Sequence, residues 1–444
     1  MSDVARCSVS LFSGGGFGDI GVEYGAGVPI LAMCELLPER ANVLRRLFPN
    51  ACVHCGDIWE CKQGVVDQVR RHLGEGKRPQ LLVMSPPCQG MSSNGVGRIL
   101  SAVARKQRPE LDPRNRLLLP AIEVVEALQP EWIVLENVRN MRNTVIMNEF
   151  DVLENVLDVL RRRLANYDIR VEVLDAASFG VPQRRERLIT IGRRSSHATA
   201  RSYHPDVTHG PGKLPHVTLH AATRHLPDLD ALSKRVDEFD PLHRIPEWSH
   251  LQYMAMSHTP EGHTAFDNDS CVRCRTRVDD PRVAVCPTCT ELMPRPLVKK
   301  SYWRCKHCAS LTPRTRTVCG QAHARSDEED IVLHDVIRAF KTAYRRMHHD
   351  RPSSTLTTNS GVISSDVKGH PHQNRVLSLR EVLIVASLSS HPGFDAPWAK
   401  AESTLEGLPD RCIRHIAGES IPPLVMFRIV RHLLSYDADV AAAA

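Results

Sequence analysis

The stretch Ser8–Gly18, SVSLFSGGGFG, decides the fold. It opens with the short apolar run Ser8–Phe12 and continues into a cluster of glycines. Glycines let the backbone turn tightly and come close to a bound ligand. An apolar run that ends in such a cluster, with a helical pattern after it, predicts a strand, a turn and a helix. The alternative is a tight turn with no ligand role.

Outward from this stretch, apolar runs alternate with helical patterns over about 190 residues. This alternation predicts an α/β fold with a Rossmann-like, doubly wound and mainly parallel sheet. In such a sheet, ligands bind beyond the carboxyl ends of the strands. The later strands are expected at Pro29–Cys34, Ala51–His54, Leu81–Met84, Trp132–Leu135, Ile169–Leu174 and Arg187–Ile191, with helices at Pro38–Phe48 and about Leu117–Leu128.

The composition is that of an ordinary globular protein, with 42% hydrophobic and 24% charged residues among 444. No apolar run reaches the roughly 18 residues that a membrane-spanning helix needs, and the first residues lack a signal-peptide pattern. We therefore expect a cytoplasmic, nucleoid-associated protein. Its 14 cysteines are then expected to stay reduced and to act as metal ligands or nucleophiles.

The positive charge is concentrated in one middle segment. Residues 193–326 contain 20 Lys and Arg against 13 Asp and Glu, whereas the rest of the chain contains 37 against 38. Within residues 271–325 the counts are 12 and 3. Such an excess is typical of a surface that faces phosphates. The alternative is a basic face that contacts only solvent.

Three polar segments adjoin the predicted strands. SPPCQG at Ser85–Gly90 follows one strand and places Cys88 at the carboxyl edge of the sheet. ENV at Glu136–Val138 ends another strand, and QRRER at Gln183–Arg187 precedes a third. A thiol at such an edge is a nucleophile when nearby positive charge favours the thiolate. The alternatives are a buried structural cysteine and surface ion pairs.

Taken in order, these segments resemble the motifs of the cytosine-5 DNA methyltransferases. The resemblance covers about residues 8–193 and 350–434. It departs from the family pattern at Ser10 (often Asp), at Glu419 (usually Asn), and after Arg380, where an LQGFP-like run is missing. The matching segments are the glycine cluster, Glu35, GDI at Gly56–Ile58, PPCQG at Pro86–Gly90, ENV, QRRER, RPSSTLT at Arg351–Thr357, RVLSLRE at Arg375–Glu381 and GESIPP at Gly418–Pro423.

The resemblance implies an enzyme that transfers a methyl group from S-adenosyl-L-methionine to C5 of a flipped cytosine in a specific duplex DNA site, through a covalent Cys–C6 intermediate. The implied catalytic residues are Cys88 as nucleophile, Glu136 at N3, Asn137 positioning the loop of Glu136, Arg187 at O2 and Arg185 bracing the pocket. The implied cofactor-binding residues are Phe12, Ser13, Gly14, Gly16, Gly18, Glu35 at the ribose, Asp57 at the adenine, Ile58, Pro86 and Ser420.

Paired cysteines in the basic segment indicate one or two structural Zn²⁺ ions. A redox role is the weaker alternative because these pairs lie outside the α/β pattern. Interleaved pairing of the cysteines and His307 as a rival ligand stay open. The first expected ligand set is Cys271, Cys274, Cys286 and Cys289, and the second is Cys305, Cys308, Cys319 and His323.

The expected domains are a catalytic domain at 1–193, a target-recognition domain with the zinc knuckles at 194–350, and a segment at 351–444 that returns to the catalytic domain. Helices are also expected at Ile331–His348, near Leu379–Leu388 and at Pro422–Leu434. The candidate DNA contacts are Gln89, Ser92, Arg273, Arg275, Arg277, Arg314 and Arg316.

Two other functions stay open at this point. A methyltransferase that acts on RNA, such as tRNA, uses a similar pocket, and a catalytically inactive DNA-binding protein would keep the same fold. For a DNA methyltransferase we expect a prokaryotic type, either solitary or part of a restriction-modification system with a cognate endonuclease as partner.

Overall fold

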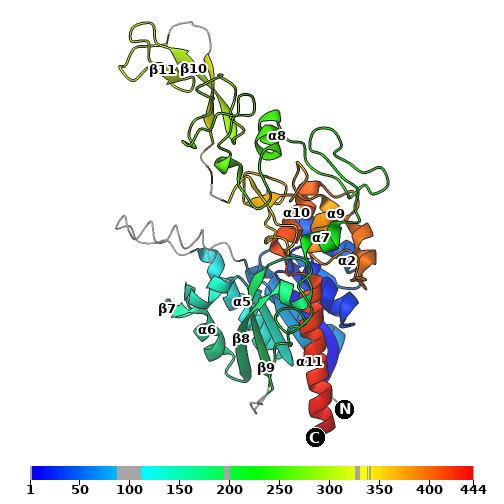
Figure 1. Cartoon of the computed structure of the whole chain (residues 1–444). Coiled ribbons are helices and arrows are strands. Elements are labelled where there is room, and N and C mark those ends of the chain that lie inside the picture. The colour runs from blue at the N-terminus through cyan, green and yellow to red at the C-terminus, as the bar shows by residue number, and fades with distance from the viewer. Residues whose placement is uncertain are drawn as a thin grey trace. The chain divides into compact units, whose positions relative to one another are not determined.

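The computed structural model describes residues 3–87, 112–194, 201–325, 331–337, 339 and 342–443 (Figure 1). The chain forms two compact units, and each is interrupted in sequence. Unit 1 comprises residues 1–225, 350–358 and 382–444, and unit 2 comprises residues 226–349 and 359–381. Unit 1 thus extends past residue 193, and residues 359–381 belong to unit 2. The functional domain boundaries stay a prediction.

Unit 1 is built on a seven-stranded sheet with the strand order β3-β2-β1-β4-β5-β9-β8. Every pairing from β3 to β5 is parallel, and β9 runs antiparallel to both of its neighbours. This confirms the predicted α/β fold with a mainly parallel sheet. The strands are β1 (Val4–Leu11), β2 (Ile30–Glu35), β3 (Cys52–Cys55), β4 (Arg78–Met84), β5 (Trp132–Asn137), β8 (Tyr167–Asp175) and β9 (Glu186–Arg194).

Helices pack against the sheet, whose central strands β1, β4 and β5 are mostly buried. All six residues of β5 are buried. The main core combines strand residues with α3 (Ile58–Leu73), α5 (Leu118–Leu128) and α6 (Val156–Arg163). In α3 the buried residues Val65, Val66 and Val69 lie on one face, and Asp57 caps the first turn.

The long helix α11 (Pro423–Ala443) contacts α1 (Phe17–Ile20) and the π-helical turn η1 (Gly21–Gly25). A Cβ atom at Gly21 would lie 2.1 Å from the carbonyl oxygen of Pro423, so this close packing requires glycine. The remaining elements are α2 (Pro38–Leu47), η2 (Pro113–Leu117), η3 (Arg139–Asn143), β6 (Val145–Met147), β7 (Leu153–Asn155), η4 (Ala176–Phe179), α7 (Leu219–Thr223), η6 (Ala399–Leu405) and α10 (Asp410–Glu419).

Unit 2 has little regular structure and several small cores. One apolar core includes Trp248, Met256 and Tyr344, and two further cores are centred on cysteines. The helix α9 (Leu379–Val385) spans the sequence boundary between the units. The elements wholly within unit 2 are α8 (His250–Ser257), η5 (Ala265–Asp267), β10 (Leu297–Arg304), β11 (Leu311–Pro313), β12 (Ile331–Val336), β13 (Arg345–Arg346) and β14 (Val367–Gly369).

The predicted helix at Ile331–His348 is wrong. Residues Ile331–Val336 form β12, which pairs antiparallel with β10, and the described residues from 337 to 348 are not helical. The β-branched side chains of β12 favour a strand, and β10 supplies the backbone partners that a strand needs. No helix in the described parts of the chain is long and apolar enough to cross a membrane.

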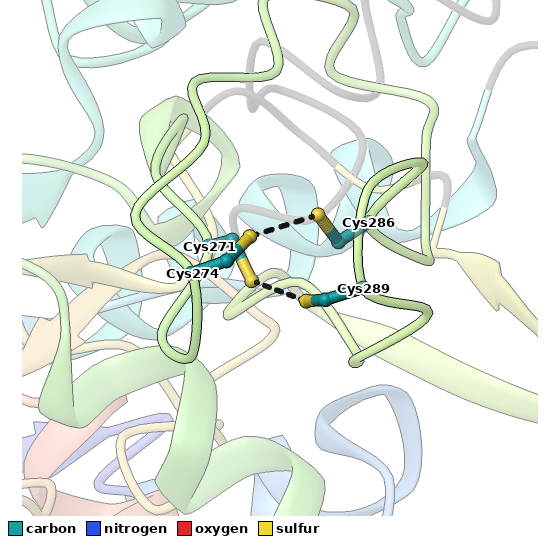
Figure 2. A group of neighbouring side chains, drawn as sticks. All are labelled: Cys271, Cys274, Cys286 and Cys289. Atoms are coloured by element: carbon teal, nitrogen blue, oxygen red, sulfur yellow. Dashed lines mark hydrogen bonds between the residues drawn. The ribbon is translucent and has the colours of Figure 1, made fainter.

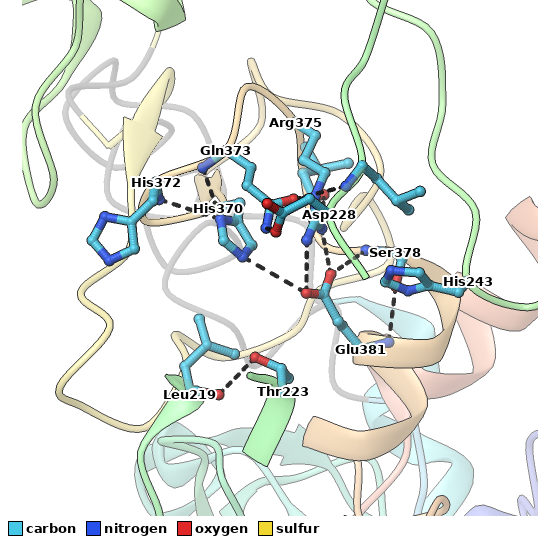
Figure 3. Close-up of polar contacts among 12 residues, drawn as sticks. Leu219, Thr223, Asp228, His243, His370, His372, Gln373, Arg375, Ser378 and Glu381 are labelled. Carbon is cyan, nitrogen blue, oxygen red and sulfur yellow. Dashed lines mark hydrogen bonds and ion pairs between the residues drawn. The ribbon is translucent and has the colours of Figure 1, made fainter. Parts of the chain in front are cut away.

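Arg375, Ser378 and Glu381 form a buried polar network in unit 2 (Figure 3). Arg375 Nη2 donates to Glu381 Oε1 at 2.9 Å, and the backbone N–H of Ser378 donates to Glu381 Oε2 at 2.7 Å. Burial alone would raise the pKa of Glu381, but the Arg375 guanidinium holds that pKa at about 2. Burial also lowers the pKa of neighbouring His370 to about 3, so this imidazole is neutral. The network therefore contains one compensated ion pair.

Candidate functional site

The polar strand ends of unit 1 meet at the carboxyl edge of the sheet. The backbone N–H of Ser13, after β1, donates to Cys34 O in β2 at 3.1 Å. The N–H of Gly56, after β3, donates to Glu35 O at 3.0 Å, and that of Ser85, after β4, donates to Leu11 O at 3.2 Å. These bonds bring the glycine loop, Glu35, the GDI segment and the start of SPPCQG to one edge, as parallel strands require.

The glycine loop adopts a conformation that few other residues allow. Gly14 has φ +56° and Gly16 has φ +79°, and Phe12 shares this left-handed region at φ 58°. A Cβ atom at Gly16 or Gly18 would lie 2.7–2.8 Å from apolar side chains, so these two glycines serve packing. A Cβ atom at Gly14 would have no neighbour within 4 Å. The loop is therefore open at Gly14, as a ligand-binding loop needs to be.

Glu35 holds the glycine loop in place. Its carboxylate accepts the backbone N–H of Gly14 at 2.8 Å and that of Leu37 at 3.0 Å. Burial raises the pKa of Glu35, while these bonds and nearby Arg40 oppose that rise. Arg40 itself forms a 2.5 Å ion pair with Glu419, the residue at which the sequence departs from the family pattern. The Glu419 charge is therefore paired.

The GDI segment and its neighbours offer both polar and apolar contacts. Asp57 is exposed, and its Oδ1 accepts the N–H of Trp59 at 2.9 Å, whereas Ile58 is buried. Leu36 is 59% exposed and Trp59 is 41% exposed, so both present apolar surface to solvent. Neither residue is among the sequence-predicted site residues, although Leu36 directly follows Glu35 and Trp59 lies two positions after Asp57. Exposed apolar surface beside two carboxylates suits the flat, polar-edged ring of a nucleoside.

Glu136 and Arg187 meet at the same edge, across the antiparallel pair β5 and β9. Arg187 Nε lies 2.9 Å from Glu136 Oε1, and their side chains are only 15% and 7% exposed. Arg187 also lines a cavity of about 520 Å³. The other lining residues are Val138, Arg139, Asn140, Asp175, Arg184, Glu186 and Thr355. The structure thus brings together two of the predicted catalytic groups beside a cavity large enough for a base.

Asn137 connects this pair to the SPPCQG segment. Its Nδ2 donates to Pro86 O at 2.9 Å, and its Oδ1 accepts the N–H of Val138 at 2.8 Å. Both Asn137 and Pro86 are buried, so this connection is protected from water. The predicted nucleophile Cys88 and the predicted DNA contacts Gln89 and Ser92 lie outside the described residues.

Arg185 is buried apart from this cavity. Its Nη1 donates to Leu356 O at 2.9 Å, and its Nη2 donates to Gly418 O at 3.0 Å. Gln183 makes similar bonds, because its side chain donates to Val385 O and accepts from Leu356 N–H. Arg185 therefore ties the RPSSTLT and GESIPP segments to the sheet. The latter segment includes Ser420, which is half-buried at the end of α10.

Both predicted cysteine sets are assembled in unit 2. In the first, two loops turn four sulfur atoms toward one another (Figure 2), with 3.5 Å between Cys271 and Cys289 Sγ and 3.6 Å between Cys274 and Cys286 Sγ. In the second, His323 Nδ1 lies 3.5 Å from the Sγ atoms of both Cys305 and Cys319, and Cys308 completes the group. Tetrahedral zinc with Zn–S bonds of 2.3 Å separates sulfur atoms by about 3.8 Å, so both groups fit zinc.

The five predicted DNA-contacting arginines are exposed in the cysteine-rich part of unit 2. Arg277 Nε forms ion pairs with Asp269 at 3.0 Å and with Asp279 at 2.8 Å, so its charge is partly neutralised. Arg273 and Arg275 flank Cys274, and Arg314 and Arg316 follow β11. All five are therefore displayed by loops next to the two cysteine groups.

Comparisons with known proteins identify related chains. A model of the C-5 cytosine-specific DNA methylase family matches residues 7–435. The type II methyltransferase M1.HgaI of Avibacterium volantium is 26% identical over 438 residues, which cover 96% of this chain and 98% of that protein. The type II methyltransferase M1.HphI of Haemophilus parahaemolyticus is 31% identical over 187 residues, 42% of this chain and 45% of that protein.

A solved structure shares the fold. It is that of a candidate DNA modification methyltransferase encoded within a prophage of E. coli. Its TM-score is 0.53 at 16% identity, and the alignment covers 97% of this chain and 99% of that one.

Proposed function

Because this chain belongs to the C-5 cytosine-specific DNA methylase family, we propose how its own residues carry out the methylation of cytosine. It is a DNA cytosine-5 methyltransferase of the S-adenosylmethionine-dependent kind. The observation that carries the proposal is the Glu136–Arg187 pair beside a cavity, joined through Asn137 to the segment that leads to Cys88.

The chemistry requires a nucleophile because C5 of cytosine is too weakly nucleophilic on its own. The Cys88 thiolate attacks C6, and the carboxyl group of Glu136 protonates or hydrogen-bonds N3 while Arg187 donates to O2. C5, made electron-rich by this addition, then takes the methyl group that S-adenosyl-L-methionine would supply, and the thioether S-adenosyl-L-homocysteine would leave. A base removes the C5 proton, and elimination releases Cys88. Charge-assisted bonds to N3 and O2 strengthen as charge develops on the ring, so they stabilise the transition state.

The target base has to leave the duplex to reach these groups. Extrusion of a cytosine costs a few kcal/mol, which contacts in the pocket offset. The cavity beside Arg187 is the proposed binding place for the extruded base. Asn137 acts as a positioning residue, because it holds Pro86 and thereby the backbone that approaches Cys88. Arg185 supports the pocket through the two carbonyl groups that it binds.

The cofactor site is proposed at the glycine loop. S-adenosyl-L-methionine supplies the methyl group when bound. The open position at Gly14 accommodates it within the loop Phe12–Gly18, with Glu35 at the ribose and Asp57 at the adenine. Leu36 and Trp59 would contact the faces of the adenine ring, which explains why they are exposed. The remaining proposed contacts are Ser13, Gly16, Gly18, Ile58, Pro86 and Ser420.

Unit 2 is the proposed target-recognition domain. Zinc at the two cysteine groups would hold loops that a small polar core cannot stabilise, since zinc contributes roughly 10–16 kcal/mol of apparent binding energy in small modules. The exposed arginines on these loops would then contact phosphates and guanine edges of double-stranded DNA. The named relatives are type II methyltransferases, which supports a restriction-modification role with a cognate endonuclease.

Replacement of the nucleophile tests the proposal. Duplex DNA with 5-fluorocytosine should trap a covalent adduct on Cys88, found by mass spectrometry, because fluorine blocks the final proton removal. Cys88→Ser should abolish both the adduct and methyl transfer, whereas Cys412→Ser, at a half-buried position of unit 1, should keep both. An adduct elsewhere, or methylation by Cys88→Ser at the normal rate, would refute the mechanism. Bisulfite sequencing of modified DNA would report the target site, and tRNA serves as the comparison substrate.

A further inference from the structure

Unit 2 contains a third cluster of metal-binding side chains, separate from the two cysteine groups. It consists of Glu261, His349 and His372, whose ligand atoms all lie within 4.8 Å of one another. His349 Nδ1 is 2.8 Å from Glu261 Oε1 and 2.9 Å from Oε2. His372 Nδ1 is 3.9 Å from Glu261 Oε2, and the two imidazole rings are 5.1 Å apart between centroids.

These distances fit a shared ion better than direct bonding of all three residues. The 3.9 Å separation of His372 from Glu261 is too long for a hydrogen bond. Zinc bonds of 2.0–2.2 Å to nitrogen and oxygen would place tetrahedral ligand atoms about 3.3–3.5 Å apart. The observed separations from the carboxylate, 2.8 to 3.9 Å, bracket that value. Small side-chain rotations would therefore admit an ion.

Three separate segments are fixed so that the cluster is preorganised. Buried Arg346 donates to the carbonyl oxygens of Thr259 and Met256, just before Glu261, and to that of His370, just before His372. The strand pair β13 and β14 adds backbone bonds between the segments that carry the two histidines. One buried guanidinium thus sets the positions of all three ligand-bearing segments.

The backbone on either side of the ligands is also fixed. His370 Nδ1 accepts the backbone N–H groups of His372 at 3.2 Å and Gln373 at 3.0 Å. Figure 3 shows that the ring of His372 points away from the buried network that holds its backbone. Glu261 Oε1 accepts the backbone N–H of His349 at 2.6 Å, which orients the carboxylate.

We propose that Glu261, His349 and His372 bind a divalent transition metal ion, with Zn²⁺ as the natural occupant. Two imidazole nitrogens and one carboxylate oxygen form a donor set that suits zinc. The side chains are 24%, 44% and 57% exposed, so an ion enters from solvent and water completes the coordination. The ion clamps three segments of unit 2, and this role does not depend on the proposed catalytic mechanism.

Zinc counting tests the proposal. Protein equilibrated with Zn²⁺ and then freed of unbound metal is analysed by inductively coupled plasma mass spectrometry. The wild type should hold one equivalent more than His349→Asn/His372→Asn. The matched control His250→Asn, an exposed histidine of unit 2 at the start of α8, should equal the wild type. Equal zinc content in the wild type and the double variant would overturn the proposal, whatever number the cysteine groups hold.

A second measurement needs no variant and is independent of variant folding. Diethyl pyrocarbonate modifies accessible imidazoles, and mass spectrometry locates the modified residues. Added Zn²⁺ should protect His349 and His372 while His250 stays reactive. Unchanged modification of both ligand histidines with and without Zn²⁺ would also overturn the site. A methylation failure of the wild type would count against the mechanism proposed above but would leave both of these readouts intact.

Discussion

Arg187→Met is expected to slow methyl transfer without removing the nucleophile. The substitution keeps an unbranched apolar stem but deletes the guanidinium, whose Nε lies 2.9 Å from Glu136 Oε1. Both groups are mostly shielded from water, so their interaction is only weakly screened. A hydrogen bond to a charged group contributes about 1.5–3 kcal/mol. If the wild-type Arg187 donates a full hydrogen bond to the developing charge on O2, losing that bond in the variant lowers kcat/KM by roughly 10- to 150-fold.

The assay is transfer of a labelled methyl group from S-adenosylmethionine to DNA at limiting substrate. Arg139→Met is the matched control, because Arg139 lines the same cavity but its side chain is 71% exposed. Its Nη1 forms only an exposed ion pair, at 3.4 Å from Glu186 Oε2. The control should stay within about threefold of the wild type, as expected when an exposed ion pair worth at most about 1 kcal/mol is lost. Activity of Arg187→Met within twofold of the wild type, at unchanged thermal stability, would refute the role given to Arg187. An equal loss of activity in Arg139→Met would show that the effect is not specific to Arg187.

Three further perturbations follow from contacts described above. Arg375→Met leaves the buried Glu381 carboxylate without its partner and should lower the free energy of unfolding by about 3–5 kcal/mol in denaturant titration; Arg375→Met/Glu381→Leu should recover most of this loss. Gly15→Ala would place a Cβ atom 2.1 Å from Ile416 Cγ2, so we expect the free energy of unfolding to fall by about 1–3 kcal/mol and the KM for the cofactor to rise. Adding Ile416→Ala to the same chain should reverse both effects. Cys271→Ala should release one zinc equivalent and weaken DNA binding, and unchanged metal content would contradict the first cysteine site.

The strands of the seven-stranded sheet could be predicted because most of them are short apolar runs bounded by polar or glycine residues, whereas the separate pair β6 and β7 was not predicted. Trp132–Asn137 is buried throughout, so its apolar run carries a strong signal. The glycine loop, Glu35 and Glu136 could be located for the same reason, since each one directly follows such a run. The sequence could not show that Gly14 faces open space while Gly15, Gly16 and Gly18 of the same loop do not, because that depends on which side chains pack against each glycine.

Unit 2 was less predictable because its contacts are distant in sequence and its cores are small. Apolar residues after Ile331 suggested a helix, but β10 provides a strand partner that local periodicity does not reveal. By contrast with that helix, both cysteine groups could be predicted from their closely spaced cysteine pairs. By contrast, Glu261 and His349 are 88 residues apart, and no local spacing connects them. Leu36 and Trp59 were missed because exposure of an apolar side chain cannot be read from its type.

The two carbonyl partners of Arg185 have a consequence for how the enzyme is made in the cell. Gly418 lies 233 positions after Arg185, so at 5–20 residues per second a ribosome needs about 10 to 50 s to supply it. Until then the Arg185 guanidinium lacks the second of its two carbonyl partners, since Leu356 is supplied earlier, and the proposed support of the pocket stays incomplete. A polypeptide that ends before Gly418 would thus lack this contact of the proposed pocket, although Cys88, the proposed nucleophile, has already been synthesised.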